Sequence, residues 1–417
     1  IFVYIVKKEE DIMKKFNKVL SVVVASAMVM AMAGCGNTDN GSAATGTNAA
    51  TESAAADNGA ASGSVFKIGG IGPTTGGAAV YGLAVQHGAE IAVEEINAAG
   101  GINGYQVEFK FQDDEADAEK SVNAYNALKD WGAQVLDGST TSGACIAVTD
   151  KTKEDNMFQI TPSGSAVECV QYDNNFRVCF SNPNQGLASA QYIGENGLAE
   201  KIAVIYDSSD VYSSGIYEKF VKEAENQPFE VVAAEAFTAD NKTDFSVQLQ
   251  KAKDAGADMV FLPIYYQESA LILTQAAAMG YAPKWFSCDG MDGILGGVDN
   301  FDVSLTEGVM LLTPFAADAT DDLTQSFVTK YKEKYGETPN QFAADSYDAI
   351  YVIKAAIEKS GVTPDMSVSD ICDGMKAAMT EITVDGLTGN GMTWTADGEA
   401  NKAPKAVVIE NGAYKAM

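Results

Sequence analysis

Residues 65–111, VFKIGGIGPTTGGAAVYGLAVQHGAEIAVEEINAAGGINGYQVEFKF, contain the pattern that indicates the fold class most clearly. The apolar start, residues 65–71, predicts a strand, and the turn GPTTGG leads into a helix over residues 80–98. Val107, Phe109 and Phe111 then alternate with polar residues, as in a second strand. A strand, a helix and a strand in one stretch predict a parallel βαβ unit.

The same alternation continues along the chain. Further strands are expected up to Leu136 and at residues 157–161, 201–209 (KIAVIYDSS), 230–236 and 259–264; further helices are expected to open at DDEADAEK (113–120), with acidic residues in the first turn, and to cover residues 144–153, 217–225, 243–255 and 268–279. Repeated βα units predict parallel sheets with helices on both faces. More than 350 such residues exceed one core, so two domains are expected.

The glycine-rich turn GGIGPTTGG does not fit a nucleotide loop. Gly70, Gly72 and Gly76 are spaced one residue too far apart for the dinucleotide fingerprint, and Pro73 interrupts them. No phosphate-binding G-x-x-x-x-G-K-[ST] motif occurs either. The turn is therefore interpreted as a connection beside a cleft, because ligands of open α/β sheets bind at the carboxyl ends of strands.

The N-terminal part has the pattern of a bacterial secretory signal. From Met13, the first plausible start, the sequence MKKFNKVLSVVVASAMVMAMAGC has a basic beginning, an apolar run and small residues before Cys35. The apolar run, residues 19–33, is shorter than the roughly 20 residues that span a membrane. Ala33-Gly34-Cys35 resembles a lipoprotein cleavage box, which makes Cys35 the expected lipidation site; the alternative is an ordinary signal peptide with an incidental cysteine.

The segment after Cys35 predicts a flexible tether. Residues 36–64 contain no side chain more apolar than alanine, so burial cannot offset the entropy of ordering them. A coil of this length spans roughly 30 Å. The expected organisation is upstream residues and signal over 1–34, a lipidated cysteine and tether over 35–64, and folded domains beyond.

Composition excludes several classes of function. The formal charge of −29 argues against a nucleic-acid partner, for which basic patches dominate affinity. His87 is the single histidine, so a two-histidine zinc site is impossible, and no G-x-S-x-G nucleophile elbow occurs. His87 shares an apolar helix face with Val80, Ala84 and Ile91, which favours a packed or partly exposed side chain. No metal or cofactor is expected, and no pair of carboxylates stands out as catalytic.

Cysteine spacing gives no metal or redox motif. Five cysteines follow Cys35, and no C-x-x-C occurs. Cys169 and Cys179 flank nine residues that are rich in Asn and Asp. Two interpretations stay open: a disulfide formed outside the cell, or two buried free thiols.

Residues 65–417 resemble the branched-chain amino-acid-binding family of bacterial transport proteins. The stretches that carry the resemblance are KIGGIGPTTGGAAVYG, HGAEIAVEEINAAGGINGYQVEF, STTSGA, ITPSGSA, IYDSSDVYSSG and GLTGNGMTWTADGEANK. HGAEIAVEEINAAGGINGYQVEF is the most specific of these stretches, and the resemblance rests on the order and spacing of all of them. The family consists of two-lobed, type I periplasmic-binding proteins that serve ABC importers and are lipid-anchored in Gram-positive cells.

The resemblance implies how the first lobe binds an amino acid. Ser142 matches a serine that donates to the α-carboxylate, Ser163 a position that offers backbone groups, and Ser165 a threonine that helps hold the α-carboxylate and α-ammonium. Tyr81 matches an aromatic residue of the side-chain pocket, and Phe342 is expected to be another.

The second lobe and the pocket wall are implied in the same way. Tyr212 and Tyr265 match aromatic residues that close over the ligand, and Asp289 matches a glutamate that accepts from the α-ammonium, with an arm shorter by one methylene. Thr140 and Thr141 stand where branched-chain binders carry apolar residues. Because buried hydroxyls need partners, a small or polar side chain is as plausible as a branched one.

The resemblance implies an α/β protein of two doubly wound parallel-sheet lobes, joined by a hinge that the chain crosses several times. Lobe 1 is expected over residues 65–183 plus 314–389, and lobe 2 over 184–313 plus 390–417. The expected function is capture of an amino acid outside the cytoplasm by a lipid-anchored monomer, which hands it to an ABC permease. It is a binding function and not an enzymatic one.

Three alternatives stay open. A sensor of the same fold would signal through a receptor partner. A carboxylate-based hydrolase would turn its ligand over. A binder of an amide, urea or an aromatic acid would keep the transport role and change the ligand.

Overall fold

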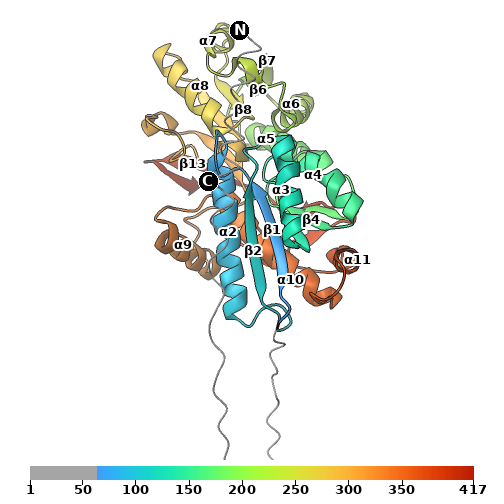
Figure 1. The fold of residues 1–417 in the computed structure, drawn as a ribbon. Coiled ribbons are helices and arrows are strands. Elements are labelled where there is room, and N and C mark those ends of the chain that lie inside the picture. The colour runs from blue at the N-terminus through green and yellow to red at the C-terminus, as the bar shows by residue number, and fades with distance from the viewer. Residues whose placement is uncertain (1–62) are drawn as a thin grey trace, which may run out of the picture. The chain divides into compact units, whose positions relative to one another are not determined.

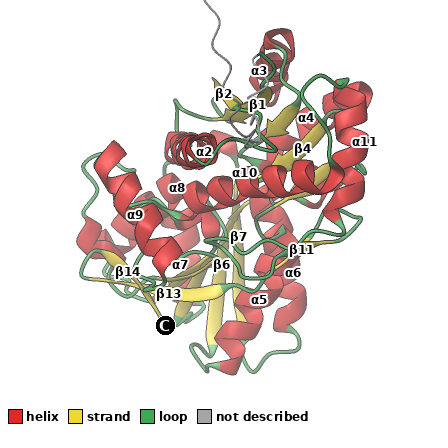
Figure 2. Cartoon of the chain, turned by 90° about the horizontal axis from the view of Figure 1, so that it is seen from below, coloured by secondary structure: helices red, strands yellow, loops and turns green. Residues whose placement is uncertain are grey.

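The computed structural model describes residues 63–417, and the signal segment, Cys35 and nearly all of the tether lie outside the described residues. Two parallel sheets dominate this part of the chain (Figures 1 and 2). The first sheet has the order β2-β1-β3-β4-β5. Its strands are β1 (Phe66–Gly72), β2 (Val107–Asp113), β3 (Val135–Asp137), β4 (Phe158–Thr161) and β5 (Asn175–Arg177), all parallel.

The second sheet repeats this order and extends it at one edge. The order is β14-β13-β10-β9-β8-β6-β7. Its parallel strands are β6 (Lys201–Asp207), β7 (Glu230–Phe237), β8 (Met259–Leu262), β9 (Lys284–Ser287) and β10 (Met310–Thr313); β13 (Lys405–Glu410) and β14 (Ala413–Ala416) add an antiparallel edge. A small ribbon, β11 (Thr393–Trp394) with β12 (Ala400–Asn401), precedes that edge.

Helices cover both faces of each sheet. They are α2 (Ala79–Ala98), α3 (Ala118–Trp131), α4 (Ser142–Asp155), α5 (Asn182–Glu195), α6 (Val211–Ala224), α7 (Ser246–Asp254), α8 (Tyr266–Ala278), α9 (Asp322–Tyr335), α10 (Gln341–Ser360) and α11 (Val368–Met379). Short 3-10 turns lie at Val167–Val170, Ala239–Asn241, Asp289–Met291 and Val303–Thr306. The predicted α/β class with helix-covered parallel sheets is therefore confirmed.

Residues 202–205 of strand β6 are all apolar because both faces of this strand are buried. Ile202 and Val204 are buried in one hydrophobic cluster with side chains of α5 and α6, whereas Ala203 and Ile205 are buried in the cluster that includes α7 and α8. Successive side chains of a strand point to opposite faces. A central parallel strand covered on both faces must therefore be apolar at every position, and not only at alternate ones.

The chain passes between the two sheets three times. It leaves the first sheet after β5, returns after β10 to form α9, α10 and α11, and enters the second sheet again at β13. Helix α10 packs on α2, beside the first sheet. The lobe boundaries given above stay a prediction, with these crossings as its support.

Two helix boundaries differ from the sequence expectation. Helix α3 begins only at Ala118, because Glu115 and Ala116 have positive φ angles of 50° and 58°, which a right-handed helix excludes. Helix α6 begins at Val211, earlier than expected, although VYSSG contains poor helix formers. The Asp210 side chain accepts a hydrogen bond from the Tyr212 N–H and caps that end.

The cysteines and the histidine are placed as follows. All five cysteines in the described residues are buried and free, so of the two interpretations of Cys169 and Cys179 the structure has free thiols. His87 is partly buried and stacks on Tyr335, with ring centroids 3.7 Å apart, which confirms the packed interpretation.

The crossing of α2 over α10 gives a stability prediction. A methyl group added at Gly88 would lie 2.0 Å from the backbone oxygen of Ala343, which cannot turn aside as a side chain does. We expect Gly88→Ala to lower the free energy of unfolding by about 1–3 kcal/mol, although alanine is the better helix former. Urea denaturation measures this.

Gly143→Ala is the matched control. Gly143 also lies in a helix, α4, and its added methyl group would meet no atom within 4 Å. This variant should be as stable as the unchanged protein or gain up to about 1 kcal/mol. Equal stability of the Gly88→Ala variant and the unchanged protein would contradict the close packing of α2 on α10.

Candidate ligand site between the two sheets

A pocket lies where the carboxyl ends of strands from both sheets meet. It is lined by Tyr81, Thr140, Thr141, Ser142, Ser163, Tyr212, Tyr265, Asp289, Gly290 and Phe342. It has about 250 Å³ of space that no atom fills, part of it open to solvent. The pocket is therefore a narrow site for a small ligand.

The fold explains why these residues meet. In the first sheet, Tyr81 follows β1 and Thr140, Thr141 and Ser142 follow β3, which are the neighbours at which the strand order reverses. The second sheet places Tyr212 after β6 and Tyr265 after β8, at its own reversal point. Such switch points are where doubly wound sheets bind ligands.

Nine of the ten residues predicted from the sequence line the pocket. The tenth, Ser165, is fully buried behind Ser142: its backbone N–H donates to Ser142 Oγ at 3.1 Å, and the two hydroxyl oxygens lie 3.5 Å apart. The Ala166 N–H donates to the same oxygen, also at 3.1 Å. Two N–H donors occupy the lone pairs of Ser142 Oγ, so its O–H is left to donate to an acceptor.

The first turn of α4 adds backbone donors beside Ser142. The first helical hydrogen bond of α4 runs from Cys145 N to Thr141 O at 2.8 Å, and helix geometry leaves the preceding N–H groups without helical partners. The partial positive charge of a helix N-terminus adds to these donors. This side of the pocket therefore suits a carboxylate.

Asp289 faces this side from the second sheet. Its Oδ1 accepts from Tyr212 Oη at 2.6 Å and its Oδ2 from Gln185 Nε2 at 2.7 Å. Burial raises the pKa of the Asp289 carboxyl to about 7, although these two hydrogen bonds lower it. Asp289 is the one ionisable acid among the lining residues, and no lysine or arginine lines the pocket with it. A cationic group in the pocket would therefore pair with Asp289.

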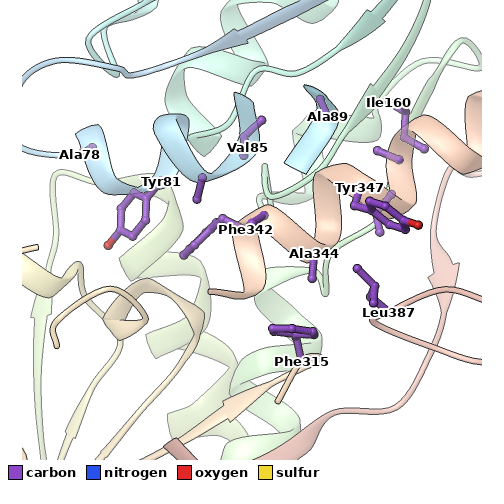
Figure 3. Close-up of a cluster of buried hydrophobic side chains, with 14 of the residues drawn as sticks. Ala78, Tyr81, Val85, Ala89, Ile160, Phe315, Phe342, Ala344, Tyr347 and Leu387 are labelled. Atoms are coloured by element: carbon purple, nitrogen blue, oxygen red, sulfur yellow. The ribbon is translucent and has the colours of Figure 1, made fainter. Parts of the chain in front are cut away.

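Aromatic rings form the remaining wall. Tyr81 and Phe342 lie side by side, with ring centroids 4.5 Å apart (Figure 3). Tyr265 stacks on Tyr212 at 5.0 Å and meets Tyr81 edge-on at 5.4 Å. Burial raises the pKa of all three tyrosines well above the usual value of 10, which keeps their hydroxyls as donors. Tyr81 donates to the carbonyl oxygen of Gly290 and so joins the two sides of the pocket.

Two residues of the site were missed by sequence reasoning. Gly290 lines the pocket, and a methyl group there would lie 2.5 Å from Tyr212 Oη, so only glycine fits. Gln185, in the first turn of α5, holds Asp289. The adjacency of Gly290 to Asp289 was a usable signal, whereas nothing in the sequence connects Gln185 with a residue 104 positions away.

Two absences were tested in the described residues. Within residues 63–417, no group of three or more His, Cys, Asp or Glu side chains is arranged to hold a metal ion. In the same range, no helix is both long and apolar enough to cross a membrane.

Two α/β sheets with a narrow site between their strand ends define a substrate-binding protein of the periplasmic type. The sequence pattern of the family described as "Periplasmic binding protein" matches residues 65–413. The chain belongs to this family, and its relatives place it with the binding proteins of branched-chain amino-acid ABC transporters.

Two curated relatives show the similarity in sequence. The Leu/Ile/Val-binding protein homolog 3 of Brucella melitensis is 31% identical over 300 residues, which cover 72% of this chain and 80% of the relative. The leucine-, isoleucine-, valine-, threonine- and alanine-binding protein of Pseudomonas aeruginosa is 30% identical over 303 residues, covering 71% of this chain and 79% of the relative.

Solved structures show the similarity in fold. The LivJ substrate-binding protein of Streptococcus pneumoniae, solved with isoleucine, has a TM-score of 0.76 and 28% identity, and covers 85% of this chain and 99% of its own. A solute-binding protein of R. palustris, solved with benzoate, has a TM-score of 0.74, 20% identity, and coverage of 85% and 95%. The second shares the fold alone, so the fold by itself does not decide the ligand.

The titration of Asp289 gives a prediction for the protein without ligand. Its pKa is about 7 when folded, against the ordinary 3.8, so the stability that neutral Asp289 provides is present below pH 3.8 and is lost as pH rises through about 7. The Asp289→Asn variant does not titrate there. We expect its free energy of unfolding, relative to the unchanged protein, to increase from pH 4 to about pH 7 and to level off above that in urea denaturation.

Asp302→Asn is the control for this experiment. Hydrogen bonds from Ser304 lower the pKa of the exposed Asp302, so its titration is complete below pH 5. The stability difference for this variant should be flat from pH 5 to pH 8. A flat difference for Asp289→Asn over the same range would show that Asp289 is ionised throughout.

Proposed function

We propose that this chain captures a single amino acid, branched-chain or small and polar, between its two sheets and delivers it to the permease of an ABC transporter. The α-carboxylate binds Ser142 and the first turn of α4, and the α-ammonium binds Asp289. The observation that carries the proposal is this pair of opposite preferences, an anion site and a buried carboxylate, facing each other across one narrow pocket.

The remaining lining residues receive the rest of the ligand. Ser163 uses its hydroxyl to donate to Thr140 O at 2.6 Å, so it offers the ligand its backbone groups. Tyr212 and Tyr265 close over the ligand from the second sheet, and Tyr81 and Phe342 border its side chain. Ser165 acts from behind by holding Ser142. Branched-chain ligands are supported by the names of the relatives, and the Pseudomonas relative's name adds threonine and alanine.

An amino acid explains Asp289 better than the alternative ligands do. An aromatic acid would bring a carboxylate and no cation, and would leave Asp289 either neutral or repelled by it. Urea and amides carry no charge to pair with it. A zwitterion satisfies both sides of the pocket with charge-assisted hydrogen bonds, which are the strong ones.

A thermal-shift screen tests the proposal. Residues 65–417 are screened with the twenty amino acids and with simple amides, urea and aromatic acids. A ligand at one hundred times its dissociation constant stabilises a protein by roughly 2.7 kcal/mol, a readable shift. We expect shifts only with α-amino acids. Shifts confined to urea, amides or aromatic acids would contradict the ligand class, and conversion of the bound ligand would show an enzyme.

Substitution of Ser142 tests the carboxylate site in particular. A hydrogen bond to a charged group contributes about 1.5–3 kcal/mol, so Ser142→Ala should weaken binding by roughly 10- to 150-fold in titration calorimetry. Ser360→Ala is the control, because Ser360 ends the helix whose first turn carries Phe342 and lies about 27 Å along its axis. An unchanged affinity in Ser142→Ala would exclude the proposed carboxylate contact.

The location of the protein is part of the proposal. The family is extracytoplasmic, and the lipoprotein pattern at Cys35 supports a monomer anchored to the membrane of a Gram-positive cell through residues 35–64. In cells fed an alkyne-labelled fatty acid, the full-length protein should take up the label and Cys35→Ala should not. Equal labelling of both would place the acyl chain elsewhere, and no labelling of either would favour an ordinary signal peptide.

A further inference from the structure

Thr141 has a hydroxyl that the fold leaves unused. Thr141 is the N-cap residue of α4, with extended backbone angles (φ −92°, ψ 150°). A threonine at this position normally accepts a hydrogen bond from the first turn of the helix. Thr141 makes no such bond, and neither does Ser181 of α5, whereas the cap residues of α3, α6, α9, α10 and α11 all do.

Two neighbouring hydroxyls are used within the fold, and the O–H of Ser142 is kept for the ligand's α-carboxylate. Thr140 donates to Ile71 O at 3.1 Å, Ser163 donates to Thr140 O, and Ser142 accepts from two backbone N–H groups. Thr141 Oγ1 is buried and has no hydrogen-bond partner among residues 63–417. Since a buried hydroxyl without a partner is costly and rare, something that enters the site must complete it.

The pocket shows what that partner is. Thr141 is 6% exposed and lines the ligand pocket together with Ser142. If Ser142 and Asp289 take the two α-groups of the ligand, the group left to meet Thr141 belongs to the ligand's side chain.

We propose that Thr141 is the specificity-determining residue of the site, and that it selects an amino acid with a hydroxyl on its β-carbon, threonine above its isostere valine. This inference rests on the proposed function and adds the class of side chain to it. A site built to bind a substrate hydroxyl discriminates strongly against the analogue that lacks it, because the site's own polar group is then left unpaired.

Calorimetric titration with threonine and valine tests the inference. The two ligands have nearly the same shape and differ by a hydroxyl in place of a methyl group. We expect the unchanged protein to bind threonine at least about tenfold more tightly than valine. Thr141→Val should remove or reverse this preference, and Thr141→Ser, which keeps the hydroxyl, should retain it.

Thr149→Val is the matched control. The Thr149 hydroxyl lies in α4, donates to Ile146 O at 2.8 Å and is not part of the pocket lining, so its loss should affect both ligands alike and leave their affinity ratio unchanged. A ratio near one in the unchanged protein, a preference for valine, or a ratio that Thr141→Val leaves intact would each overturn the inference. So would binding confined to other amino acids, and in all these cases capture of an amino acid would still stand. Absence of binding to any amino acid would overturn both.

Discussion

The hydrogen bonds of the Arg177 guanidinium hold the loop that lies behind Ser142, and the geometry of the site depends on them. Arg177 is the one arginine of the chain, at the end of β5, and it is fully buried. It donates to the carbonyl oxygens of Gly164 at 3.2 Å, Ser165 at 2.6 Å and Ala166 at 2.9 Å. A planar guanidinium with five donors in a fixed fork can satisfy three neighbouring carbonyls and still present Nε to another group.

Arg177 also connects the loop of residues 164–166 to the segment in which the chain crosses between the sheets for the last time. Arg177 Nε lies 3.4 Å from Glu399 Oε2, Arg177 N donates to Gly398 O at 3.0 Å, and Trp394 Nε1 donates to Arg177 O at 2.8 Å. Arg177 is the buried partner of this pair, so removal of Glu399 would leave a buried charge without its anion. The loop that holds Ser142 from behind is therefore fixed to the segment that leads into β13, so the crossing and the binding surface are one connected structure.

The site follows from repetition of one topological feature. Each sheet reverses its strand order once, at β1/β3 and at β6/β8, and each reversal provides a helix N-terminus and an aromatic residue. The two sheets differ in charge: the strand ends of the first offer N–H and O–H donors, and the second offers Asp289, which follows β9. A zwitterion needs both, and neither sheet provides both. In the proposed function, backbone dipoles and not side-chain cations make the anion site of a chain whose formal charge is −29.

The fold class and most of the candidate site residues could be predicted from the sequence and its family resemblance. Apolar runs such as KIAVIYD require burial on both faces, and residues just after such strands must gather at one edge of the sheet, because parallel strands share a direction. The family resemblance then assigned Ser142, Tyr212 and Asp289 to that edge, and the structure brings them into one pocket.

Features that depend on contacts between distant residues could not be predicted from the sequence and are seen in the folded chain alone. Helix α3 starts late because left-handed residues precede it, Gln185 reaches Asp289 from 104 positions away, and the sole arginine serves a loop. Whether the hydroxyl of Thr140 or that of Thr141 is free was equally beyond the sequence, since both residues are threonines. Sequence patterns report which residues are buried, whereas hydrogen-bond partners are chosen by the packing of elements far apart in the chain.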